Sequence, residues 1–444
     1  MTPWSGQFIW WPCDHFKSLE LARIHIEAYG CSANIADSEI LSGILKESGH
    51  TLAKSELDAD ASIILTCIVK TPTELKMVRR LKELTATRHP LIVAGCMPKA
   101  ETWLVEQVAP RASLMGPDDI LNVTNILNET LRGDRVEAVS GAAPDRTCLP
   151  RMRRNPVINV APIASGCTGN CSYCIVKRAR GTITSFSADA LVEDARKSIE
   201  EGCREIWLTA EDTASYNWSG VRLPELVRML SDIEGRFYLR IGMMTPSKAK
   251  PLLEDLIEAF RSEKLFKFLH IPVQSGNDTV LGRMRRQYTV EDFRGIVERF
   301  RREVPDLSLS TDIICGFPGE TEEQFRDSIK LVEEVRPDVL NISRFWPRPG
   351  TEAEKLDGQL HSRETKKRSR ELTSIWKEIS LENGKRWLGW RGEILVDEAG
   401  PIGSMMGRNF AYKTVVLKDE APLGVFIEVK ITGLEVGYLK AERV

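Results

Sequence analysis

The sequence lacks a long apolar run, and it lacks an excess of charge of either sign. No run reaches the roughly 18 apolar residues that a membrane-spanning helix needs, so we expect no association with a membrane. Its 61 Lys and Arg residues nearly equal its 63 Asp and Glu residues, for a net charge of −2. Overall charge therefore gives no attraction to nucleic acid, and any such surface must be a local patch.

Residues 1–21 lack the basic start and the apolar stretch of a secretion signal, and we expect a poorly ordered extension or a misassigned start there. The 10 cysteines are spread over 444 residues, which is too sparse for a disulfide framework. Free thiols in this number indicate a reducing compartment, and we predict that the protein is cytoplasmic.

Three cysteines do lie close together, at positions 167, 171 and 174 of the segment Ser165–Cys174. Thiolates are the soft ligands of iron–sulfur clusters, and three of them leave one iron of a four-iron cluster open for chemistry. The alternatives are a structural zinc site and coincidental thiols. Zinc sites usually have four ligands in paired spacings, and no second pair of thiols or histidines lies near this segment. The spacing therefore favours a reactive iron–sulfur cluster.

A second set of three cysteines is far apart in the sequence but follows three predicted strands. Apolar runs beginning at Arg23, Ala61 and Leu91 alternate with helical patterns, which predicts a parallel sheet. Cys31, Cys67 and Cys96 follow these runs. The carboxyl ends of parallel strands share one edge of a sheet, so these thiols can meet there. Three buried core cysteines are the alternative, because free cysteine is often buried.

The central part of the chain has six strand patterns, and all but the last precede a helical pattern. The strands are expected near 157–163, 205–209, 238–243, 266–271, 308–314 and 339–343. Six such units predict an incomplete (β/α) barrel with its active site over the carboxyl ends of the strands. The residues at those ends are Cys167, Glu211, Asp212, Thr245, Gln274, Ser275, Asp312 through Gly316, and Arg344.

The last part of the chain has short strand patterns near 392–396, 410–417 and 425–431, separated by glycine-rich turns. They predict a small β-barrel, an architecture that often binds RNA. Arg408, Tyr412 and Lys413 are its candidate RNA contacts, and a plain packing module is the alternative.

The predicted fold class is therefore α/β followed by a small β-barrel. We expect an extension (1–21), an N-terminal parallel-sheet α/β domain (22–134), a linker (135–152), a partial (β/α)6 barrel (153–381) and a C-terminal β-barrel (382–444).

These motifs together resemble the methylthiotransferase family of radical-SAM enzymes, from about Arg23 to the C-terminus. The first-domain matches are Tyr29–Asn34, Thr66–Lys70 and Gly95–Pro98. Thr66 replaces an asparagine that is common in the family, which leaves the neighbouring ligand intact. The archaeal and eukaryotic tRNA N6-threonylcarbamoyladenosine methylthiotransferases match best, through Cys67–Glu74, Lys177–Gly181, Ile206–Thr213, Ile271–Ser275 and Asp312–Thr321.

The resemblance implies two [4Fe–4S] clusters and S-adenosylmethionine (AdoMet). Cys167, Cys171 and Cys174 would hold the radical-SAM cluster, whose open iron binds AdoMet. Cys31, Cys67 and Cys96 would hold an auxiliary cluster that delivers sulfur. In such enzymes one AdoMet provides the methyl group, and a second provides a radical that removes hydrogen from C2 of the adenine. The C-terminal part resembles an RNA-binding TRAM domain.

Further site residues are assigned by position at the strand ends. Glu211 or Asp212 is expected to contact the AdoMet amino group, Gln274 and Ser275 its ribose, and Gly316 its adenine. Ordinary helix capping and a tight turn are the alternatives for the two acids and the glycine. We expect Arg178 and Arg180 to contact an anticodon-loop phosphate. We expect Arg344 and Arg348 to contact the carboxylate of the substrate base. A solvated or packing role is the alternative for each arginine.

The implied reaction converts N6-threonylcarbamoyladenosine, next to the tRNA anticodon at position 37, to its 2-methylthio derivative. The expected partners are tRNA and a low-potential electron donor. Methylthiolation of isopentenyladenosine in tRNA, or of a ribosomal-protein aspartate, would use the same chemistry. A non-catalytic iron–sulfur scaffold that binds RNA is the alternative of another class.

Overall fold

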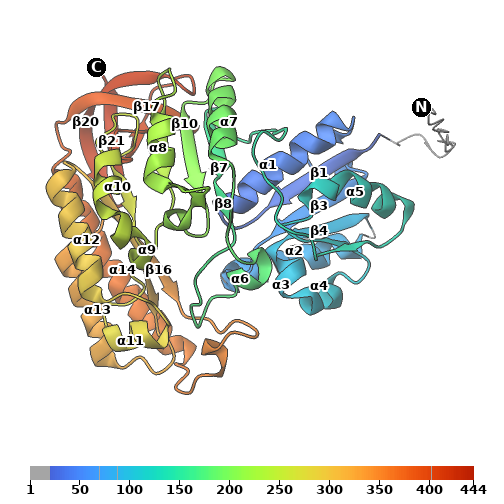
Figure 1. Ribbon diagram of the computed structural model, residues 1–444, viewed down its shortest axis with the longest axis horizontal. Coiled ribbons are helices and arrows are strands. Elements are labelled where there is room, and N and C mark those ends of the chain that lie inside the picture. The colour runs from blue at the N-terminus through green and yellow to red at the C-terminus, as the bar shows by residue number, and fades with distance from the viewer. Residues whose placement is uncertain (1–20, 70, 88, 402) are drawn as a thin grey trace, which may run out of the picture.

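The computed structural model describes residues 21–69, 71–87, 89–401 and 403–444. They fold into three units that follow one another along the chain: a sheet domain, a partial barrel and a small closed barrel (Figure 1). Residues 1–20 of the predicted extension lie outside the described residues. Among the helices that are described, none has the length and apolar character needed to cross a membrane.

The first unit is built on a parallel sheet of six strands in the order β2-β1-β3-β4-β5-β6. The strands are β1 (Arg23–Ala28), β2 (Thr51–Leu52), β3 (Ala61–Thr66), β4 (Leu91–Gly95), β5 (Ser113–Met115) and β6 (Glu137–Ala138). Every residue of β3 and β4 is buried, as expected for central parallel strands that are covered on both faces. Because β6 belongs to this sheet, the sheet extends beyond the domain boundary predicted at residue 134.

Helices cover both faces of this sheet. They are α1 (Ser32–Glu47), α2 (Thr71–Ala86), α3 (Cys96–Ala100), α4 (Thr102–Val108) and α5 (Val123–Arg132). Ile63 and Leu65 of β3 pack with α1 and α5, whereas Ile64 packs with α2 and α4. This alternation follows from the two-residue period of a strand and gives the domain two cores.

The second unit contains the six predicted strands. They are β7 (Ile158–Pro162), β10 (Glu205–Thr209), β13 (Tyr238–Ile241), β14 (Phe268–His270), β15 (Ser308–Cys315) and β16 (Val339–Arg344). They form two parallel sheets, β13-β10-β7 and β14-β15-β16, which a bridge between Leu239 and Leu265 connects. The partial (β/α)6 barrel is therefore confirmed.

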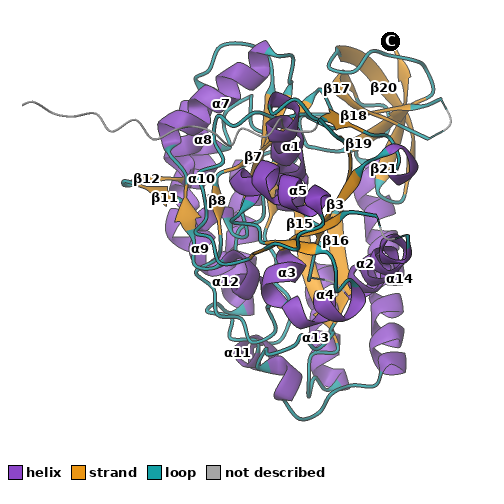
Figure 2. Cartoon of the chain, turned by 90° about the vertical axis from the view of Figure 1, so that its right-hand side faces the viewer, coloured by secondary structure: helices purple, strands orange, loops and turns teal. Residues whose placement is uncertain are grey.

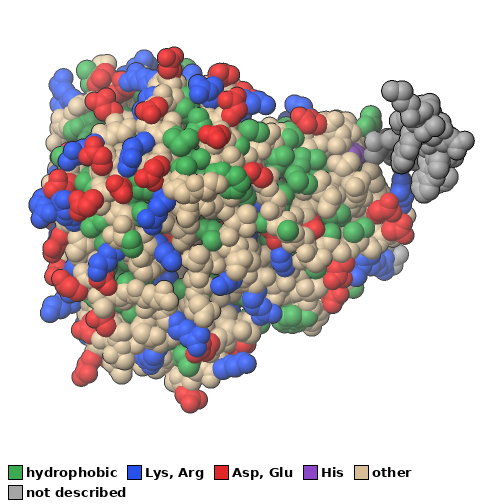
Figure 3. All heavy atoms as spheres, in the orientation of Figure 1, with side chains coloured by type: hydrophobic (Ala, Val, Ile, Leu, Met, Phe, Trp, Pro, Cys, Tyr) green, Lys and Arg blue, Asp and Glu red, His purple; other side chains and the backbone are tan. Residues whose placement is uncertain are grey.

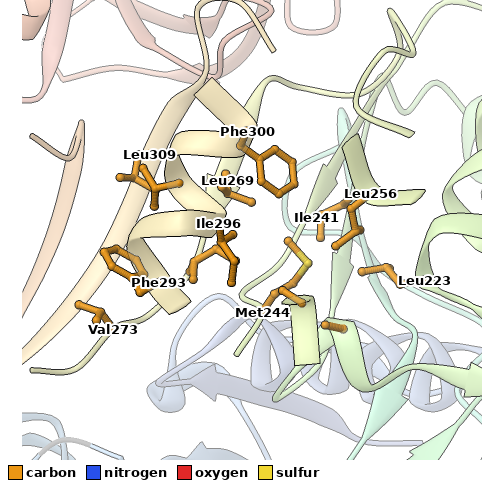
Figure 4. Packing of buried hydrophobic residues seen from close by; sticks show 14 of the residues in the cluster. Leu223, Ile241, Met244, Leu256, Leu269, Val273, Phe293, Ile296, Phe300 and Leu309 are labelled. Atoms are coloured by element: carbon orange, nitrogen blue, oxygen red, sulfur yellow. The ribbon is translucent and has the colours of Figure 1, made fainter. Parts of the chain in front are cut away.

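Helices surround this barrel and pack on one continuous apolar core. They are α7 (Ala188–Glu200), α8 (Leu223–Ser231), α10 (Leu253–Ala259), α12 (Val290–Glu303) and α13 (Glu322–Val335). Figure 4 shows Phe293, Ile296 and Phe300 of α12 turned toward Leu269 of β14 and Leu309 of β15. These side chains recur at helical spacing, which places them on one face of α12.

Shorter elements lie at the ends of the barrel strands and carry most of the predicted site. They are β8 (Ala164–Ser165), α6 (Val176–Arg180), β9 (Thr184–Ser185), β11 (Asn217–Trp218), β12 (Val221–Arg222), α9 (Pro246–Ala249) and α11 (Asp278–Arg283). The long helix α14 (Ser362–Lys385) then leads into the third unit, so the boundary predicted at residue 382 falls inside a helix.

The third unit is a closed barrel with the strand order β17-β18-β19-β21-β20. Its strands are β17 (Arg391–Ala399), β18 (Met405–Arg408), β19 (Thr414–Leu417), β20 (Phe426–Glu435) and β21 (Tyr438–Arg443). The small β-barrel is as predicted, although β18 and β21 were not expected. The strand expected from residue 410 begins only at Thr414, because Tyr412 has a positive φ of 59° in the preceding turn.

The three residues predicted to contact RNA in this barrel instead contact protein. The Tyr412 ring lies 4.8 Å from that of Phe266 and packs edge-on against it. The Lys413 ammonium donates to Asp338, and the Arg408 guanidinium lies 3.4 Å from the Asp397 carboxylate. The RNA-contact prediction for these residues was wrong, because Tyr412 and Lys413 join the two barrels and Arg408 is paired within the small barrel.

The same interface buries a pair of acids, Glu205 of β10 and Asp397 of β17. Burial and the nearby Asp397 carboxylate raise the pKa of Glu205 to about 8. Burial raises the pKa of Asp397 to about 6, although the Arg408 guanidinium opposes this rise. Near neutral pH, Glu205 is therefore the acid that keeps its proton, and it can donate that proton to Asp397.

We predict that this interface makes stability depend on pH. The pKa of Glu205 is raised above its ordinary value of 4.5. The stability that protonated Glu205 contributes is therefore full below about pH 4.5 and is lost as pH rises toward 8. Glu205→Gln removes this titration. The unfolding midpoint of the variant should therefore fall less than that of the wild type between about pH 6 and pH 8.5, as measured by anaerobic thermal unfolding. Glu333→Gln on the exposed face of α13 is the control, and equal slopes for wild type and Glu205→Gln would contradict the prediction.

Candidate functional site

The first candidate site is the loop that carries Cys167, Cys171 and Cys174, which we call the cluster loop. It leaves β8 at the carboxyl end of the barrel strands and continues into α6. A Cβ atom built on Gly169 would lie 3.2 Å from Sγ of Cys167 and 3.7 Å from Sγ of Cys171. A side chain at residue 169 would therefore enter the space between these two thiols, where glycine leaves room for a cluster.

The segment that follows α11 holds this loop in place through hydrogen bonds. The backbone N–H of Ser172 donates to the carbonyl of Met284 at 3.1 Å, and the Ser172 hydroxyl donates to the carbonyl of Arg283 at 2.8 Å. The Arg286 guanidinium donates to Sγ of Cys171 at 3.2 Å. A third backbone bond, from Ala353 N–H to the Ser172 carbonyl at 2.8 Å, holds the loop from the other side.

The Arg286 guanidinium favours the charged form of the thiols beside it. Burial raises the pKa of Cys174 to about 11, and Arg286 acts against this rise. The guanidinium also lies over the rings of Tyr173 and Tyr288, 5.9 and 5.5 Å from their centroids. Cluster ligands must be deprotonated, so a fixed cation at this position suits metal binding. The sequence showed only a run of arginines, which does not reveal which one is turned toward the loop.

The second candidate site brings Cys31, Cys67 and Cys96 together at one edge of the parallel sheet. Burial raises the pKa of Cys96 to about 12, and the neighbouring thiols of Cys31 and Cys67 contribute to the rise. A Cβ on Gly30 would lie only 2.8 Å from Sγ of Cys67. The three cysteines are therefore neighbours, although they are buried to different degrees: Cys31 is exposed and the other two are buried.

Two polar side chains hold the three cysteine segments together. The Asn34 amide donates to the carbonyls of Tyr29 and Thr66, at 2.7 and 2.8 Å. The Thr66 hydroxyl accepts from the backbone N–H of Met97 at 3.3 Å. The segments before Cys31 and Cys67 and the start of α3 are thus tied to one another. Thr66, where the family often has asparagine, fills this role with its hydroxyl group.

In neither thiol set do all three Sγ atoms lie within 4.8 Å of one another. Tetrahedral zinc with Zn–S bonds of about 2.3 Å places its sulfur ligands about 3.8 Å apart. Within the described ranges, the only set of His, Cys, Asp or Glu ligand atoms that lie within 4.8 Å of one another is His25, Glu27 and Glu56. Arg80 already donates to both of those glutamates. The thiol sets therefore fit a larger group, as an iron–sulfur cluster is.

A buried chain of charges connects the two thiol sets. Arg180 of α6 donates to the Asn34 side chain at 2.8 Å and forms an ion pair with the Asp37 carboxylate, also at 2.8 Å. Its Nε lies 3.8 Å from the Glu211 carboxylate. Burial alone would raise the pKa of Asp37, but the guanidinium groups of Arg180 and Arg146 hold it below its ordinary value. The prediction that Arg180 contacts an RNA phosphate was wrong, because its guanidinium is 3% exposed and already paired.

Glu211 and Asp212 both lie at the barrel mouth with partners of their own. Glu211 Oε2 accepts from the backbone N–H of Gly166 at 2.9 Å, directly before Cys167. Asp212 accepts from Thr245 N–H at 3.1 Å and from the Ser215 hydroxyl at 3.2 Å. Burial raises the pKa of both carboxyl groups. Glu211 is thus the acid that bridges the cluster loop and Arg180.

Gln274, Ser275 and Gly316 lie at neighbouring strand ends. Gln274 has a positive φ of 72°, and its backbone pairs with β15. Ser275 is fully buried, and its hydroxyl accepts from the Asn277 N–H at 3.3 Å. A Cβ on Gly316 would lie 2.4 Å from the Thr365 side chain. The glycine is therefore needed for its positive φ and for the close packing of α14, and its expected contact with adenine stays a prediction.

The two arginines considered for a substrate carboxylate have different surroundings. Arg348 is 4% exposed and pairs with Glu74 of α2, and its Nε and Nη2 atoms have no hydrogen-bond acceptor. Arg344 instead lies over the Trp346 ring, 4.9 Å from its centroid. Arg178 is exposed and donates to the Pro349 carbonyl at 2.6 Å. No sequence signal connected Glu74 with Arg348, because 274 residues separate them.

Three family models match consecutive parts of the chain. The Radical SAM superfamily matches residues 162–332, the Uncharacterized protein family UPF0004 matches 23–116, and the TRAM domain matches 387–444. Among solved structures, the radical S-adenosylmethionine methyltransferase TsrM from Kitasatospora setae has a TM-score of 0.56 at 13% identity. The alignment covers 87% of this chain and 80% of that one, which supports the fold.

Two curated relatives match nearly the whole chain. The "Probable threonylcarbamoyladenosine tRNA methylthiotransferase" of Methanothermobacter thermautotrophicus is 42% identical over 95% of this chain and 99% of its own length. The "Threonylcarbamoyladenosine tRNA methylthiotransferase" of Homo sapiens is 35% identical over 93% of this chain and 72% of its own length. With these identities and the three matched regions, the chain belongs to the threonylcarbamoyladenosine tRNA methylthiotransferase family of radical-SAM proteins.

Proposed function

We propose that this protein converts N6-threonylcarbamoyladenosine in tRNA to its 2-methylthio derivative. The observation that carries the proposal is the pair of thiol sets on either side of the buried link from Asp37 through Arg180 to Glu211. Such an arrangement lets one base face two reactive groups at once. The names of the relatives supply the substrate.

The residues present fit two clusters and AdoMet. Cys167, Cys171 and Cys174 would hold a [4Fe–4S] cluster that binds AdoMet, with Glu211 or Asp212 accepting from its amino group and Gln274, Ser275 and Gly316 near its nucleoside. Cys31, Cys67 and Cys96 would hold a second cluster. When bound, these groups supply the radical, the methyl group and the sulfur. A low-potential electron donor is required, and a reducing cytoplasm suits the nine described cysteines, none of which forms a disulfide.

The chain itself supplies a dry, fixed reaction space. The Tyr173 ring packs edge-on against Phe317 at 6.4 Å, and Phe317 packs against Phe345 at 5.4 Å, so aromatic side chains lie directly beneath the cluster loop. A radical must be kept from solvent and held near the carbon it attacks. Rigid packing here keeps water out, and Arg286 fixes the position of Cys171.

Arg348 is the residue that we propose for the substrate carboxylate. Its charge opposes the burial-driven rise in the pKa of Cys67, so it faces the second thiol set. Glu74 occupies one edge of the guanidinium, and two donor atoms are left without an acceptor. The threonyl group of the substrate carries a carboxylate that can accept from them. An isopentenyl group offers no acceptor, and a buried cation beside it would be costly.

The test of the proposed function compares two tRNA substrates. Reduced enzyme and AdoMet are supplied with tRNA that carries threonylcarbamoyladenosine or with tRNA that carries isopentenyladenosine. We expect methylthio product, measured by nucleoside mass spectrometry, from the first tRNA alone. Product from the second tRNA alone would show that the proposed substrate is incorrect. Absence of AdoMet cleavage would favour the alternative of a non-catalytic scaffold.

The two thiol sets should have separable roles. The wild type should hold about eight irons per chain, and replacing Cys167, Cys171 and Cys174 with alanine should leave about four and abolish AdoMet cleavage. Replacing Cys31, Cys67 and Cys96 should also leave about four, with AdoMet cleavage retained and methylthio product lost. Iron analysis and the two products are measured on each variant.

The control for these variants is Cys203→Ala, because Cys203 is buried in the core and belongs to neither set. It should keep its iron and both products. Methylthio product from the Cys31, Cys67 and Cys96 variant would show that these residues are core cysteines.

Replacing Arg348 should remove the preference for the threonylcarbamoyl group. The wild type should bind tRNA with this group more tightly than the same tRNA with plain adenosine. Arg348→Gln should lower that ratio about tenfold, since a hydrogen bond to a charged group contributes about 1.5–3 kcal/mol. Arg348→Lys should restore part of the preference, because the charge remains without the planar fork. Arg344→Gln is the matched control, and an equal loss in Arg344→Gln would refute the assignment.

A further inference from the structure

A short hairpin beside the cluster loop has no part in the chemistry described above. Strands β11 and β12 are joined by Ser219 and Gly220, which have φ values of 49° and 93°. Both residues have a left-handed backbone conformation, as in the tight two-residue turns that match the twist of a hairpin. The Asn217 side chain accepts from Gly220 N–H at 3.1 Å and closes the turn. Figure 2 shows the hairpin projecting from the molecule above α9.

A cavity of about 280 Å³ lies between this hairpin, α9 and the cluster loop. The side chains that matter for its chemistry are Thr168, Ser215, Asn217, Arg222, Ser247 and Lys248. None of the residues that line the cavity is acidic. Arg222 and Lys248 take part in no ion pair in the described part of the chain, whereas many of the surface arginines and lysines are paired.

This combination of groups suits a phosphate. Two cations supply charge, and three hydroxyl groups and an amide supply hydrogen-bond donors, as in the phosphate contacts of nucleic-acid-binding proteins. Trp218 follows Asn217 in β11 and pairs with Val221 of β12, so it lies on the opposite face of the hairpin from Asn217 and Arg222, and it is 39% exposed. Exposed aromatic rings are the usual stacking partners of unpaired RNA bases. A phosphate site on one face of the hairpin and an exposed indole ring on the other match consecutive nucleotides of a single-stranded loop.

The position of the cavity connects it with the reaction. Thr168 belongs to the cluster loop, and its hydroxyl lies 3.4 Å from that of Ser215. Ser215 in turn donates to Asp212 at the barrel mouth. The cavity and the cluster site therefore share a wall. Acidic and basic side chains are interspersed over the face of the molecule in Figure 3. A local cation pair is therefore a means by which this nearly neutral chain can hold RNA.

We infer that this cavity binds a backbone phosphate of the anticodon loop, and that Trp218 stacks on a base next to the modified adenosine. The inference rests on the proposed function and adds the surface that holds the loop. Phosphate contacts fix register, so this contact would set which base enters the site.

The test measures the affinity of the full-length, reconstituted protein for an anticodon stem–loop at several salt concentrations. R222Q/K248Q should weaken binding about tenfold or more and lower the slope of log affinity against log salt by about 0.7, the value for one lost single-strand phosphate contact. Trp218→Ala should weaken binding without changing the slope. K54Q/K330Q removes the same charge at exposed sites elsewhere and should leave affinity and slope unchanged. Equal iron content and unfolding midpoints show that each variant is folded.

Each outcome separates this inference from the proposed function. If R222Q/K248Q binds with the wild-type affinity and slope while the wild type methylthiolates tRNA, the cavity is not a phosphate site and the proposed function stands. If K54Q/K330Q loses as much affinity as R222Q/K248Q, the effect is one of overall charge and the inference is again refuted. If the wild type neither binds nor modifies tRNA, the proposed function itself falls.

Discussion

The buried carboxylate of Asp37 is the constraint on which the site depends. It belongs to the sheet domain, and it accepts from Arg146 of the following segment and forms an ion pair with Arg180 of the barrel. A buried carboxylate left without these partners would be costly, so the three segments cannot separate without a large loss of free energy. Because α6 begins two residues after Cys174 and α1 begins directly after Cys31, the same ion pairs fix how the two thiol sets face each other.

Neighbouring contacts make this geometry rigid. The hydroxyl of Ser32, next to Cys31, lies 2.6 Å from that of Thr209 at the end of β10. Arg348 joins the loop after β16 to α2 through Glu74. The sheet domain is therefore attached to the barrel at opposite sides of the barrel mouth. Such attachment suits a reaction that needs two groups to meet one base, since a small displacement would separate them.

Sequence patterns were sufficient for the fold but only for part of the site. The strands of the barrel follow apolar runs, and the three cysteines of the cluster loop share one segment, so local information is enough for both. The burial of Arg180 could not be seen locally, because its partners Asn34 and Asp37 lie some 146 residues earlier. The same holds for Tyr412, whose position in an RNA-binding module suggested stacking on a base. The guanidinium groups of Arg240 and Arg408 lie over its ring instead, 5.1 and 5.3 Å from the centroid.

The hydrogen bonds that hold the cluster loop come from segments that are synthesised much later than the loop itself. Ser172 is held by Arg283, 111 residues later in the chain, and by Ala353 later still. During synthesis the loop therefore emerges long before the segments that close it. Through that interval its three thiols lack the hydrogen bonds that the later segments supply. The loop reaches the geometry described here only once the sixth barrel strand and the loop after it have been made.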